Sequence, residues 1–442
     1  MSRRFLFAEQ KVPRYTSYPT APHFQAKVGP TIYSDWLSQI PADATLSLYV
    51  HVPFCTSLCI YCGCHTQVAR RKDPLREYVS LLGRELELVM QRTSVRKIAR
   101  IHWGGGTPSA IGGAAALAEI MEQLARLADV TAVREHAIEL DPRHVRPELV
   151  HTLAALGINR VSLGVQTFAA HVQAAMGRVQ PFATVRRAID RLRQADIDNF
   201  NFDLMYGLPR QTTTDLRETI DLAVGLSPQR LALFGYAHVP WFRPRQRLIN
   251  EADLPGVTER FDQMNTARQH LYRHGFEPIG LDHFALPSDE LAVAAREHRL
   301  HRNFQGYTDD GSAVLIGLGS SSIGRVPQGF VQNAADVVEY TRRITSNQLA
   351  TVRGIALTDD DRARGKVIEE LMCYLRTNLP PSSNLLDAPA QETLAALQHE
   401  GLVHHDGRLI IVPETARPLV RLVAAAFDAY LPNNAARHSA AV

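Results

Sequence analysis

The sequence predicts an α/β protein built from consecutive strand–helix units. Short runs rich in Val, Ile and Leu alternate with longer stretches whose apolar residues recur at helical spacing. Glycine or proline closes several of the short runs, as at Trp103-Gly104 and Asp141-Pro142. Alternation of this kind from residue 47 to residue 236 is typical of parallel strands joined by right-handed crossovers.

Six units follow one another in the chain. We expect strands at 47–52, 99–103, 137–141, 160–165, 199–205 and 230–236, and helices at 75–90, 114–127, 147–156, 185–195 and 214–226. Pockets in parallel sheets and barrels form at the carboxyl ends of the strands. The cysteine loop, Gly104–Gly106, Glu139, Gln166 and Asp203 stand at or just past such ends. The sequence therefore predicts a ligand site at this edge.

The flanking segments have a weaker pattern. We expect strands at 277–282 and 313–317, a loop at 301–308, a helix at 358–376 broken by 378–384, a helix at 391–400 and a hairpin turning at Asp406-Gly407. The chain then divides into an N-terminal arm (1–45), a catalytic domain (46–345) and a small, mainly helical, winged-helix-like C-terminal domain (346–442).

Charge and hydropathy exclude several classes. The net charge of +3 comes without a basic stripe, so we expect no nucleic-acid partner. No apolar run approaches the roughly 20 residues that cross a bilayer, and the N-terminus lacks the apolar core of a secretory signal. We therefore expect a cytoplasmic protein without a membrane partner.

Four of the five cysteines lie within one short segment, at Cys55, Cys59, Cys62 and Cys64. Such crowding favours a metal site over a disulfide framework. Three thiolates at C-x3-C-x2-C suit a four-iron, four-sulfur cluster and leave one iron open. Cys64 leaves three interpretations: a fourth ligand, a zinc ligand, or a non-ligand near the site, which we favour. Cys373, on an expected amphipathic helix, is interpreted as a buried core residue.

The cysteine spacing resembles the signature of the radical S-adenosylmethionine (SAM) superfamily. The resemblance implies a partial (β/α)6 radical SAM barrel with accessory strands, a [4Fe–4S] cluster with SAM on its open iron, and release of a 5′-deoxyadenosyl radical. The segment from Trp103 to Pro108 resembles the superfamily's glycine-rich motif, with Thr107 where many members have Glu.

The whole chain is similar to the oxygen-independent coproporphyrinogen III oxidases. The matching segments are PRYTSYPTA, SLYVHVPFC, CIYCGC, HWGGGTP, IELDPR, GVQTF, DLMYGLP, YAHVP, DHFA, HRNFQGYT and GIALT. The resemblance implies that two propionates of coproporphyrinogen III are decarboxylated to vinyl groups, giving protoporphyrinogen IX in haem biosynthesis. It also implies a reduced flavodoxin- or ferredoxin-type electron donor, and we expect a monomer.

The same resemblance implies roles for individual residues. Cys55, Cys59 and Cys62 would hold the cluster, and Tyr49 and Cys64 would act in catalysis. Tyr49, Gly105, Glu139 and Ile323 match positions around a first SAM, and Tyr61, Gly106, Thr107, Gln166, Arg178, Asp203 and Ala237 match positions around a second. Candidates for propionate contacts are Arg14, His51, His238, His283 and Arg302.

Three alternatives remain open. A haem chaperone of the same branch typically lacks Cys64, the PRYTSYPT arm and the HRNFQGYT segment, which are all present. A radical SAM methyltransferase that opens the haem ring would act on haem instead of coproporphyrinogen. A simple iron–sulfur electron carrier would use four cysteine ligands and would not cleave SAM.

Overall fold

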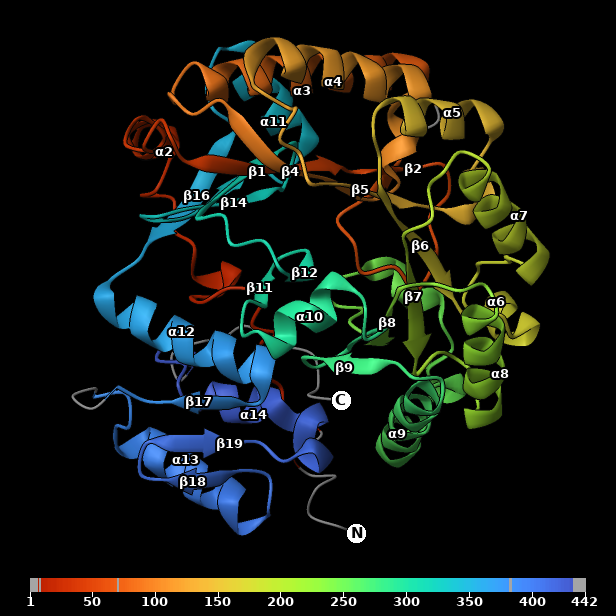
Figure 1. Ribbon diagram of the computed structural model, residues 1–442, viewed down its shortest axis with the longest axis vertical. Helices are drawn as coiled ribbons and strands as arrows, with labels where there is room; N and C mark the ends of the chain where they lie inside the picture. Colours follow the sequence, from red (N-terminus) through yellow and green to blue (C-terminus); the bar gives the residue numbers. More distant parts are fainter. Residues whose placement is uncertain (1–6, 8, 70, 381–383, 432–442) are drawn as a thin grey trace.

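The computed structural model describes residues 7, 9–69, 71–380 and 384–431, and these form an α/β structure around one large sheet (Figure 1). Within these residues the largest sheet has twelve strands, in the order β16-β15-β14-β13-β1-β4-β5-β6-β7-β8-β10-β9. The six central strands follow chain order, and each pairs in parallel with the next. The prediction of six consecutive strand–helix units is confirmed.

The observed bounds are close to those expected. The central strands are β1 (Thr45–Val52), β4 (Lys97–Gly105), β5 (Glu135–Leu140), β6 (Arg160–Gln166), β7 (Phe200–Tyr206) and β8 (Arg230–Gly235). The expected helices are α3 (Lys72–Met90), α4 (Ala114–Leu127), α5 (Pro147–Ala155), α7 (Phe182–Arg193) and α8 (Thr213–Val224). Helices that the sequence did not predict are α2 (Pro30–Ser38), α6 (Ala170–Ala175), α9 (Val257–Arg273), α10 (Glu290–Arg296), α11 (Val337–Thr345) and, in the C-terminal part, α14 (Val420–Ala425).

Accessory strands extend the sheet at both edges. On one side lie β13 (Val314–Leu318), β14 (Ile323–Val326), β15 (Gly329–Asn333) and β16 (Thr351–Ala356); on the other lie β10 (His283–Ala285) and β9 (Glu277–Ile279). The short strands β2 (Phe54–Cys55) and β3 (Gln67–Val68) bracket the cysteine loop. The result is an open mixed sheet that curves as a partial barrel, as predicted.

The predicted loop at 301–308 is wrong. These residues form a hairpin of β11 (His301–Asn303) and β12 (Gly306–Thr308). Asn303 closes the turn by accepting a hydrogen bond from the amide of Gln305 at 2.8 Å. Gly306 has a φ of 133°, which the lack of a side chain permits. The segment is rich in polar residues, so the sequence pattern did not reveal the turn that Asn303 and Gly306 form.

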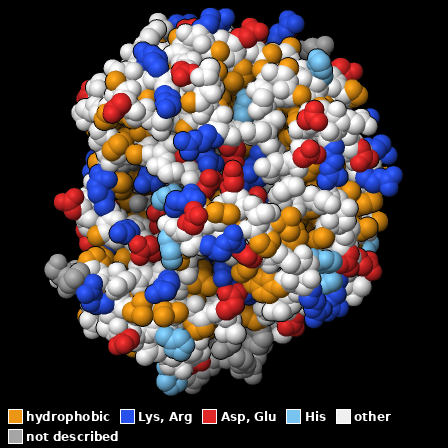
Figure 2. Space-filling model, viewed as in Figure 1, with side chains coloured by type: hydrophobic (Ala, Val, Ile, Leu, Met, Phe, Trp, Pro, Cys, Tyr) orange, Lys and Arg blue, Asp and Glu red, His pale blue; other side chains and the backbone are white. Residues whose placement is uncertain are grey.

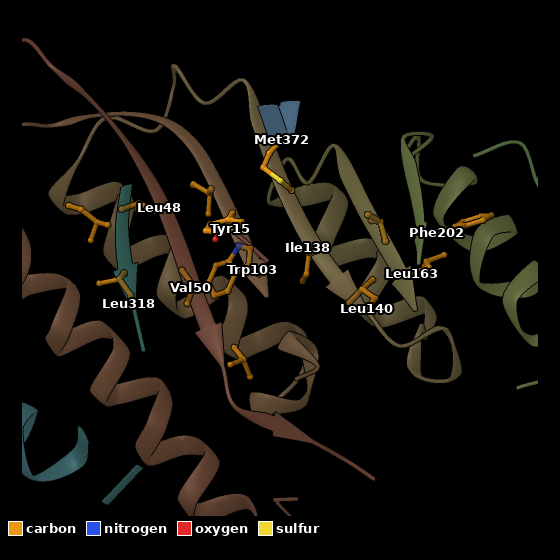
Figure 3. Close-up of a cluster of buried hydrophobic side chains, with 14 of the residues drawn as sticks. Tyr15, Leu48, Val50, Trp103, Ile138, Leu140, Leu163, Phe202, Leu318 and Met372 are labelled. Carbon is orange, nitrogen blue, oxygen red and sulfur yellow. The ribbon is translucent and has the colours of Figure 1, made fainter. Parts of the chain in front are cut away.

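The two faces of the central strands differ because successive side chains point to opposite sides. Apolar residues occupy the outer face, where Leu48, Trp103, Ile138, Leu163 and Phe202 are almost fully buried (Figure 3). Figure 1 shows α3, α4 and α5 along this side of the sheet. The inner face carries the intervening polar residues, and it forms the candidate site.

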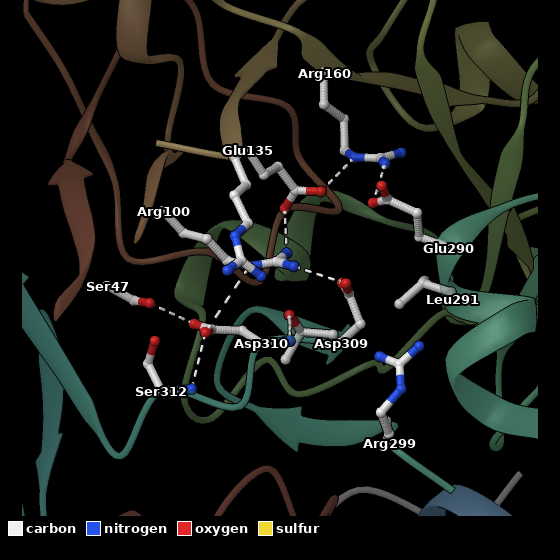
Figure 4. A network of polar contacts seen from close by, with 12 residues as sticks. Ser47, Arg100, Glu135, Arg160, Glu290, Leu291, Arg299, Asp309, Asp310 and Ser312 are labelled. Carbon is white, nitrogen blue, oxygen red and sulfur yellow. Dashed lines mark hydrogen bonds and ion pairs between the residues drawn. The ribbon is translucent and has the colours of Figure 1, made fainter. Parts of the chain in front are cut away.

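A network of charged residues lies at the amino-terminal ends of the central strands (Figure 4). Glu135 accepts hydrogen bonds from Arg160 at 2.8 Å and from Arg100 at 3.2 Å. Arg100 also donates to Asp309 at 2.7 Å. Burial alone would raise the pKa of Glu135, but Arg160, Arg230 and Arg100 lower it to about 2. In Figure 2, which is viewed from the same side as Figure 1, basic and acidic side chains gather in the middle of the visible surface.

The C-terminal part combines helices with a small sheet. Its elements are α12 (Asp359–Tyr374), β17 (Arg376–Asn378), α13 (Ala388–His399), β18 (His404–Asp406), β19 (Leu409–Ile411) and α14 (Val420–Ala425). The hairpin at Asp406-Gly407 is confirmed, and Cys373 is buried as predicted, with 4% exposure. The predicted break at 378–384 lies partly outside the described residues, as does the start of the N-terminal arm.

The N-terminal arm joins the sheet to the C-terminal part. Gln25 pairs with Gly354 of β16, and the hydroxyl of Tyr15 donates to Asp428 at 3.0 Å. Strand β16 follows residue 345 in the chain but belongs to the large sheet. The domain boundary at 345/346 stays a prediction. Within the described residues, no helix combines the length and apolar character needed to span a membrane.

Candidate functional site

A cavity of about 630 Å³ lies on the inner face near the carboxyl ends of the central strands. Its lining includes most of the predicted site residues: Cys55, Cys59, Tyr61, Cys62, Cys64, Gly105, Gly106, Thr107, Glu139, Gln166, Arg178, Asp203 and Ala237. Tyr49 and Ile323 are not among the lining residues. We refer to this space as the cofactor cavity.

Each of the three predicted cluster ligands has a hydrogen-bonding neighbour. The sulfur of Cys55 lies 3.2 Å from the hydroxyl of Thr66, and the sulfur of Cys59 accepts from Nη1 of Arg178 at 3.5 Å. The backbone amide of Cys64 donates to the sulfur of Cys62 at 3.4 Å. Donors around thiolate sulfurs are typical of iron–sulfur sites, where they stabilise the anionic ligand.

Cys62 is the thiol best prepared to ionise. Hydrogen bonds from Cys64 and the charges of Arg243 and Arg178 lower the pKa of Cys62 to about 6, although burial opposes them. Burial raises the pKa of the Cys55 thiol, so a metal must displace its proton. Cys64 itself is exposed. The backbone amide of Cys64 therefore stabilises the sulfur of Cys62, whether or not the Cys64 thiol binds the cluster.

The glycine triplet fits closely between neighbouring backbone and side chains. Gly105 has a φ of 112°, and a Cβ there would lie 2.7 Å from the ring of His51. A Cβ on Gly106 would lie 2.5 Å from the carbonyl oxygen of Phe54. The amide of Gly105 donates to Oε2 of Glu139 at 3.1 Å, so β4 and β5 jointly position this carboxylate. Only glycine fits these positions without displacing the cysteine loop.

Tyr49 and Ile323 lie next to this site without facing the cavity. The hydroxyl of Tyr49 is 2.9 Å from Nδ1 of His51, and a Cβ on Gly104 would touch the Tyr49 ring. Ile323 begins β14 and contacts Gly317, the residue that pairs with Tyr49 across β1 and β13. His51 is buried and also bonds the carbonyl of His65, which leaves it no free nitrogen for a propionate.

A second polar group lies across the cavity. Arg178 donates from Nη2 to the carbonyl of Gly164 at 2.8 Å and lies 3.6 Å from Asp141. Gln166 ends β6 with a φ of 66°, a left-handed conformation that is unusual for a residue with a side chain. Strain of this kind is often kept where a side chain must be aimed into a site.

The position of Asp203 corrects one prediction. Asp203 lies inside β7 on the inner face, and not at the strand end. It accepts hydrogen bonds from Asn201 at 2.9 Å and Ser162 at 3.3 Å. Burial and the negative charge of Glu139 raise the pKa of Asp203 to about 6. Its carboxyl is therefore poised to change protonation near neutral pH.

Sequence reasoning missed several lining residues. Asp141, Tyr236 and Gln246 line the cofactor cavity, and Gln246 holds the loop by donating to the carbonyl of Tyr61 at 2.8 Å. Asp141 directly follows β5, so the strand-end rule that selected Glu139 applied to it as well. Gln246 carried no signal, because it lies in a short 3-10 helix (Pro244–Leu248) that has no periodic pattern of its own.

Comparisons with known proteins agree with this geometry. The Radical SAM superfamily model matches residues 49–223. The oxygen-independent coproporphyrinogen III oxidase of Bradyrhizobium diazoefficiens is 44% identical and covers 99% of this chain and 98% of its own. The Escherichia coli enzyme of that name is 37% identical over 96% of this chain and 94% of its own. The solved structure of E. coli coproporphyrinogen III oxidase (HemN), described as a radical SAM enzyme, superposes with a TM-score of 0.89. It is 36% identical and covers 95% of this chain and all of that one.

The chain belongs to the family of oxygen-independent coproporphyrinogen III oxidases. It is therefore a radical SAM oxidoreductase, and that superfamily uses a [4Fe–4S] cluster and SAM. The residues present fit both groups: three thiols with hydrogen-bonding neighbours face a cavity that also presents glycine backbone, a carboxylate and a guanidinium. Membership of this oxidoreductase family also disfavours the simple electron-carrier alternative.

Proposed function

We propose that this member of the oxygen-independent coproporphyrinogen III oxidase family converts two propionates of coproporphyrinogen III to vinyl groups, giving protoporphyrinogen IX. A hydrogen atom leaves the β-carbon of a propionate; loss of carbon dioxide and one electron then leaves the vinyl group. The cluster and SAM, when bound, supply the 5′-deoxyadenosyl radical that accepts the hydrogen atom. The remaining requirements are met by the protein: binding, orientation and exclusion of water.

One observation carries the proposal. Cys55, Cys59 and Cys62 face the same cavity as Glu139 and Asp203, in a chain that matches a curated relative over almost its whole length. The relative's name states the substrate. Cys64, the PRYTSYPT arm and the HRNFQGYT segment, which a haem chaperone of the same branch typically lacks, are all present.

We assign Cys55, Cys59 and Cys62 as cluster ligands and propose two SAM molecules. Tyr49, Gly105, Glu139 and Ile323 are assigned to the first, and Tyr61, Gly106, Thr107, Gln166, Arg178, Asp203 and Ala237 to the second. Residues of both groups line the cofactor cavity: Glu139 accepts a hydrogen bond from Gly105, whereas Arg178 donates to Gly164 and Gln180. Carboxylates suit a ribose diol or an ammonium group, and a guanidinium suits a carboxylate. Tyr49 and Cys64 are proposed to act in catalysis.

The cellular setting follows from the chemistry. A reduced cluster and a radical require a reducing compartment, so we place the protein in the cytoplasm. We propose a flavodoxin- or ferredoxin-type protein as its electron donor. We also propose that the protein is a monomer. Gly63 and Cys64 are exposed beside the proposed cluster ligands, which gives a donor access to that edge of the site.

An anaerobic assay tests the proposal. Reconstituted protein is incubated with reductant, SAM and coproporphyrinogen III, and carbon dioxide, 5′-deoxyadenosine and protoporphyrinogen IX are measured. We expect all three products, and none from Cys59→Ala. Protein that cleaves SAM yet releases no carbon dioxide contradicts the proposal. A parallel incubation with haem separates the rival functions, since a haem-opening methyltransferase consumes haem and a chaperone binds it unchanged.

A further inference from the structure

A second cavity, of about 370 Å³, adjoins the cofactor cavity. Both cavities are bounded by Arg14 and by residues 234–237 at the end of β8. The basic side chains that line the second cavity are Lys11, Arg14, Arg260, Arg268, Arg302 and Arg421. Among the described lining residues, Asp282 is the only carboxylate. We call this space the basic cavity.

Most of this positive charge has no matching carboxylate within the described residues. Arg268 is paired with Glu414 at 2.7 Å. The guanidinium of Arg260 makes no hydrogen bond to another described residue, and it lies 5.8 Å from the ring centre of Tyr206. Asp282 is bound by His283 at 2.8 Å, and its charge is shared as a counter-charge by Arg302 and Arg14. Arg14 is exposed and forms no ion pair with a described side chain.

Arg302 adds a buried charge behind these residues. Its Nη2 donates to the carbonyl of Arg14 at 3.4 Å, whereas Nε and Nη1 are buried and reach no acceptor in the described part of the chain. Its guanidinium stacks 4.4 Å from the ring centre of Tyr307, which helps to keep it charged. Burial and the charge of Arg14 lower the pKa of Arg421 to about 10, a sign of repulsion within the cluster.

Two glycines, Gly207 and Gly235, leave the space that the Arg260 guanidinium and the Tyr206 ring occupy. Gly207 has a φ of 77°, and a Cβ there would lie 2.5 Å from Nη1 of Arg260. A Cβ on Gly235 would lie 2.7 Å from the hydroxyl of Tyr206, the ring beneath the guanidinium. The ends of β7 and β8 therefore leave space for a cation that no carboxylate of the described chain neutralises. Arg260 is half-buried, and a partly desolvated charge without a counter-ion costs free energy that a ligand of opposite charge can recover.

We propose that the basic cavity binds the carboxylates of the tetrapyrrole that are not reacting, with Arg14 and Arg260 as direct contacts, while the reacting propionate enters the cofactor cavity. This assignment rests on the proposed function. Guanidinium groups bind carboxylates through paired, charge-assisted hydrogen bonds, and a tetracarboxylate needs several of them. Arg14 borders both cavities and is placed to contact the ring at the passage between them.

The test measures binding of coproporphyrinogen III to anaerobically reconstituted holoenzyme. Ligand is separated by ultrafiltration and quantified after oxidation to the fluorescent porphyrin. Arg14→Met and Arg260→Met are each expected to raise Kd about tenfold or more, since each removes a charge-assisted hydrogen bond. Arg273→Met, an exposed arginine on the same helix as Arg260, is the matched control and is expected to bind like the wild type.

The remaining outcomes are decisive as well. Wild-type affinity in both methionine variants, or no binding by the wild type, overturns the assignment. Iron content and the thermal unfolding midpoint of Arg260→Met are measured alongside, to show that the variant is folded and holds its cluster. If it does not, Arg260→Lys decides: an intermediate Kd supports the assignment and a wild-type Kd overturns it. If the arginine variants bind coproporphyrinogen III more weakly but the wild type releases no carbon dioxide from it, the proposed function is refuted and the basic cavity is not. If the wild type turns over the substrate and the arginine variants have the same KM, the role of the basic cavity is refuted and the proposed function is not.

Discussion

Nη1 of Arg178 donates to the sulfur of Cys59 at 3.5 Å, which connects a proposed SAM-binding residue directly to a proposed cluster ligand. The same guanidinium is fixed by Gly164 and Gln180. We therefore expect this one side chain to affect both the electronic state of the bound cluster and the position of SAM.

Replacing this guanidinium is expected to change two properties together. In Arg178→Met the cluster loses a positive charge and a donor near a sulfur, so its reduction potential becomes more negative. SAM affinity falls about tenfold through the lost charge-assisted hydrogen bond. A redox titration followed by electron paramagnetic resonance checks the first effect. Arg187→Met, exposed on α7, is the control, and an unchanged potential in Arg178→Met contradicts this account.

The three-ligand assignment predicts unequal effects of cysteine substitution. Cys55→Ala, Cys59→Ala and Cys62→Ala are each expected to lose the cluster and all SAM cleavage. Cys64→Ala should keep close to the wild-type iron content, since Cys64 contributes its backbone amide to Cys62. Iron and sulfide analysis after anaerobic reconstitution measures both, with the buried Cys373→Ala as control. Loss of the cluster in Cys64→Ala alone reverses the assignment.

Gly105 is expected to tolerate no side chain. Gly105→Ala places a Cβ 2.7 Å from His51 at a φ of 112°, so it destabilises the fold by more than about 1 kcal/mol and displaces the carboxylate of Glu139. Thermal unfolding and SAM affinity are the measurements. Gly311→Ala is the control, because a Cβ there meets nothing within 4 Å. Equal unfolding midpoints for the two variants exclude this mechanism.

The charged network around Glu135 predicts loss of stability in acid. Its folded-state pKa of about 2 lies below the ordinary value, so its contribution is complete above about pH 4.5 and is lost as pH falls toward 2. Glu135→Gln leaves Arg160 and Arg230 uncompensated and should cost about 3–5 kcal/mol at pH 7. Urea unfolding at pH 7 and pH 3.5 is the check. The gap between variant and wild type must narrow at the lower pH.

Asp203 predicts the opposite pH dependence. Its folded-state pKa of about 6 is raised from the ordinary 3.8, so the native protein holds this proton more tightly; the stabilisation is complete below about pH 3.8 and is lost as the pH rises from there through 6. Asp203→Asn is therefore expected to unfold at a higher temperature than the wild type at pH 8, by a smaller margin at pH 5, and at a similar temperature at about pH 3.5. Asp262→Asn, exposed on α9, provides the control. A difference that does not change with pH rejects the raised pKa.

Much of this structure was predictable because its strands have strong local signals. The six units emerged from alternating apolar patterns, and the cysteine spacing identified the cluster loop. The inner-face position of Asp203 was missed because period-two alternation in NFNFDLM shows which residues share a face and not where the strand ends. The hairpin at 301–308 was missed because its polar residues concealed a turn that Asn303 and Gly306 close.

The basic cavity could not be predicted at all. Its arginines come from the arm, α9, β11 and α14, segments that lie far apart in the chain. On α9, Arg260 and Arg268 look like ordinary polar residues of an amphipathic helix. Only tertiary packing brings these charges together, and no local pattern in the sequence indicates that they line one cavity.

The contact between Tyr15 and Asp428 has a consequence for protein synthesis. Residues that line the basic cavity run from Lys11 to Arg421, so this cavity forms only after Arg421 has left the ribosome. The cysteine loop and the six strand–helix units are complete much earlier. A prematurely terminated chain would therefore carry the parts that handle the radical without the parts that hold the tetrapyrrole.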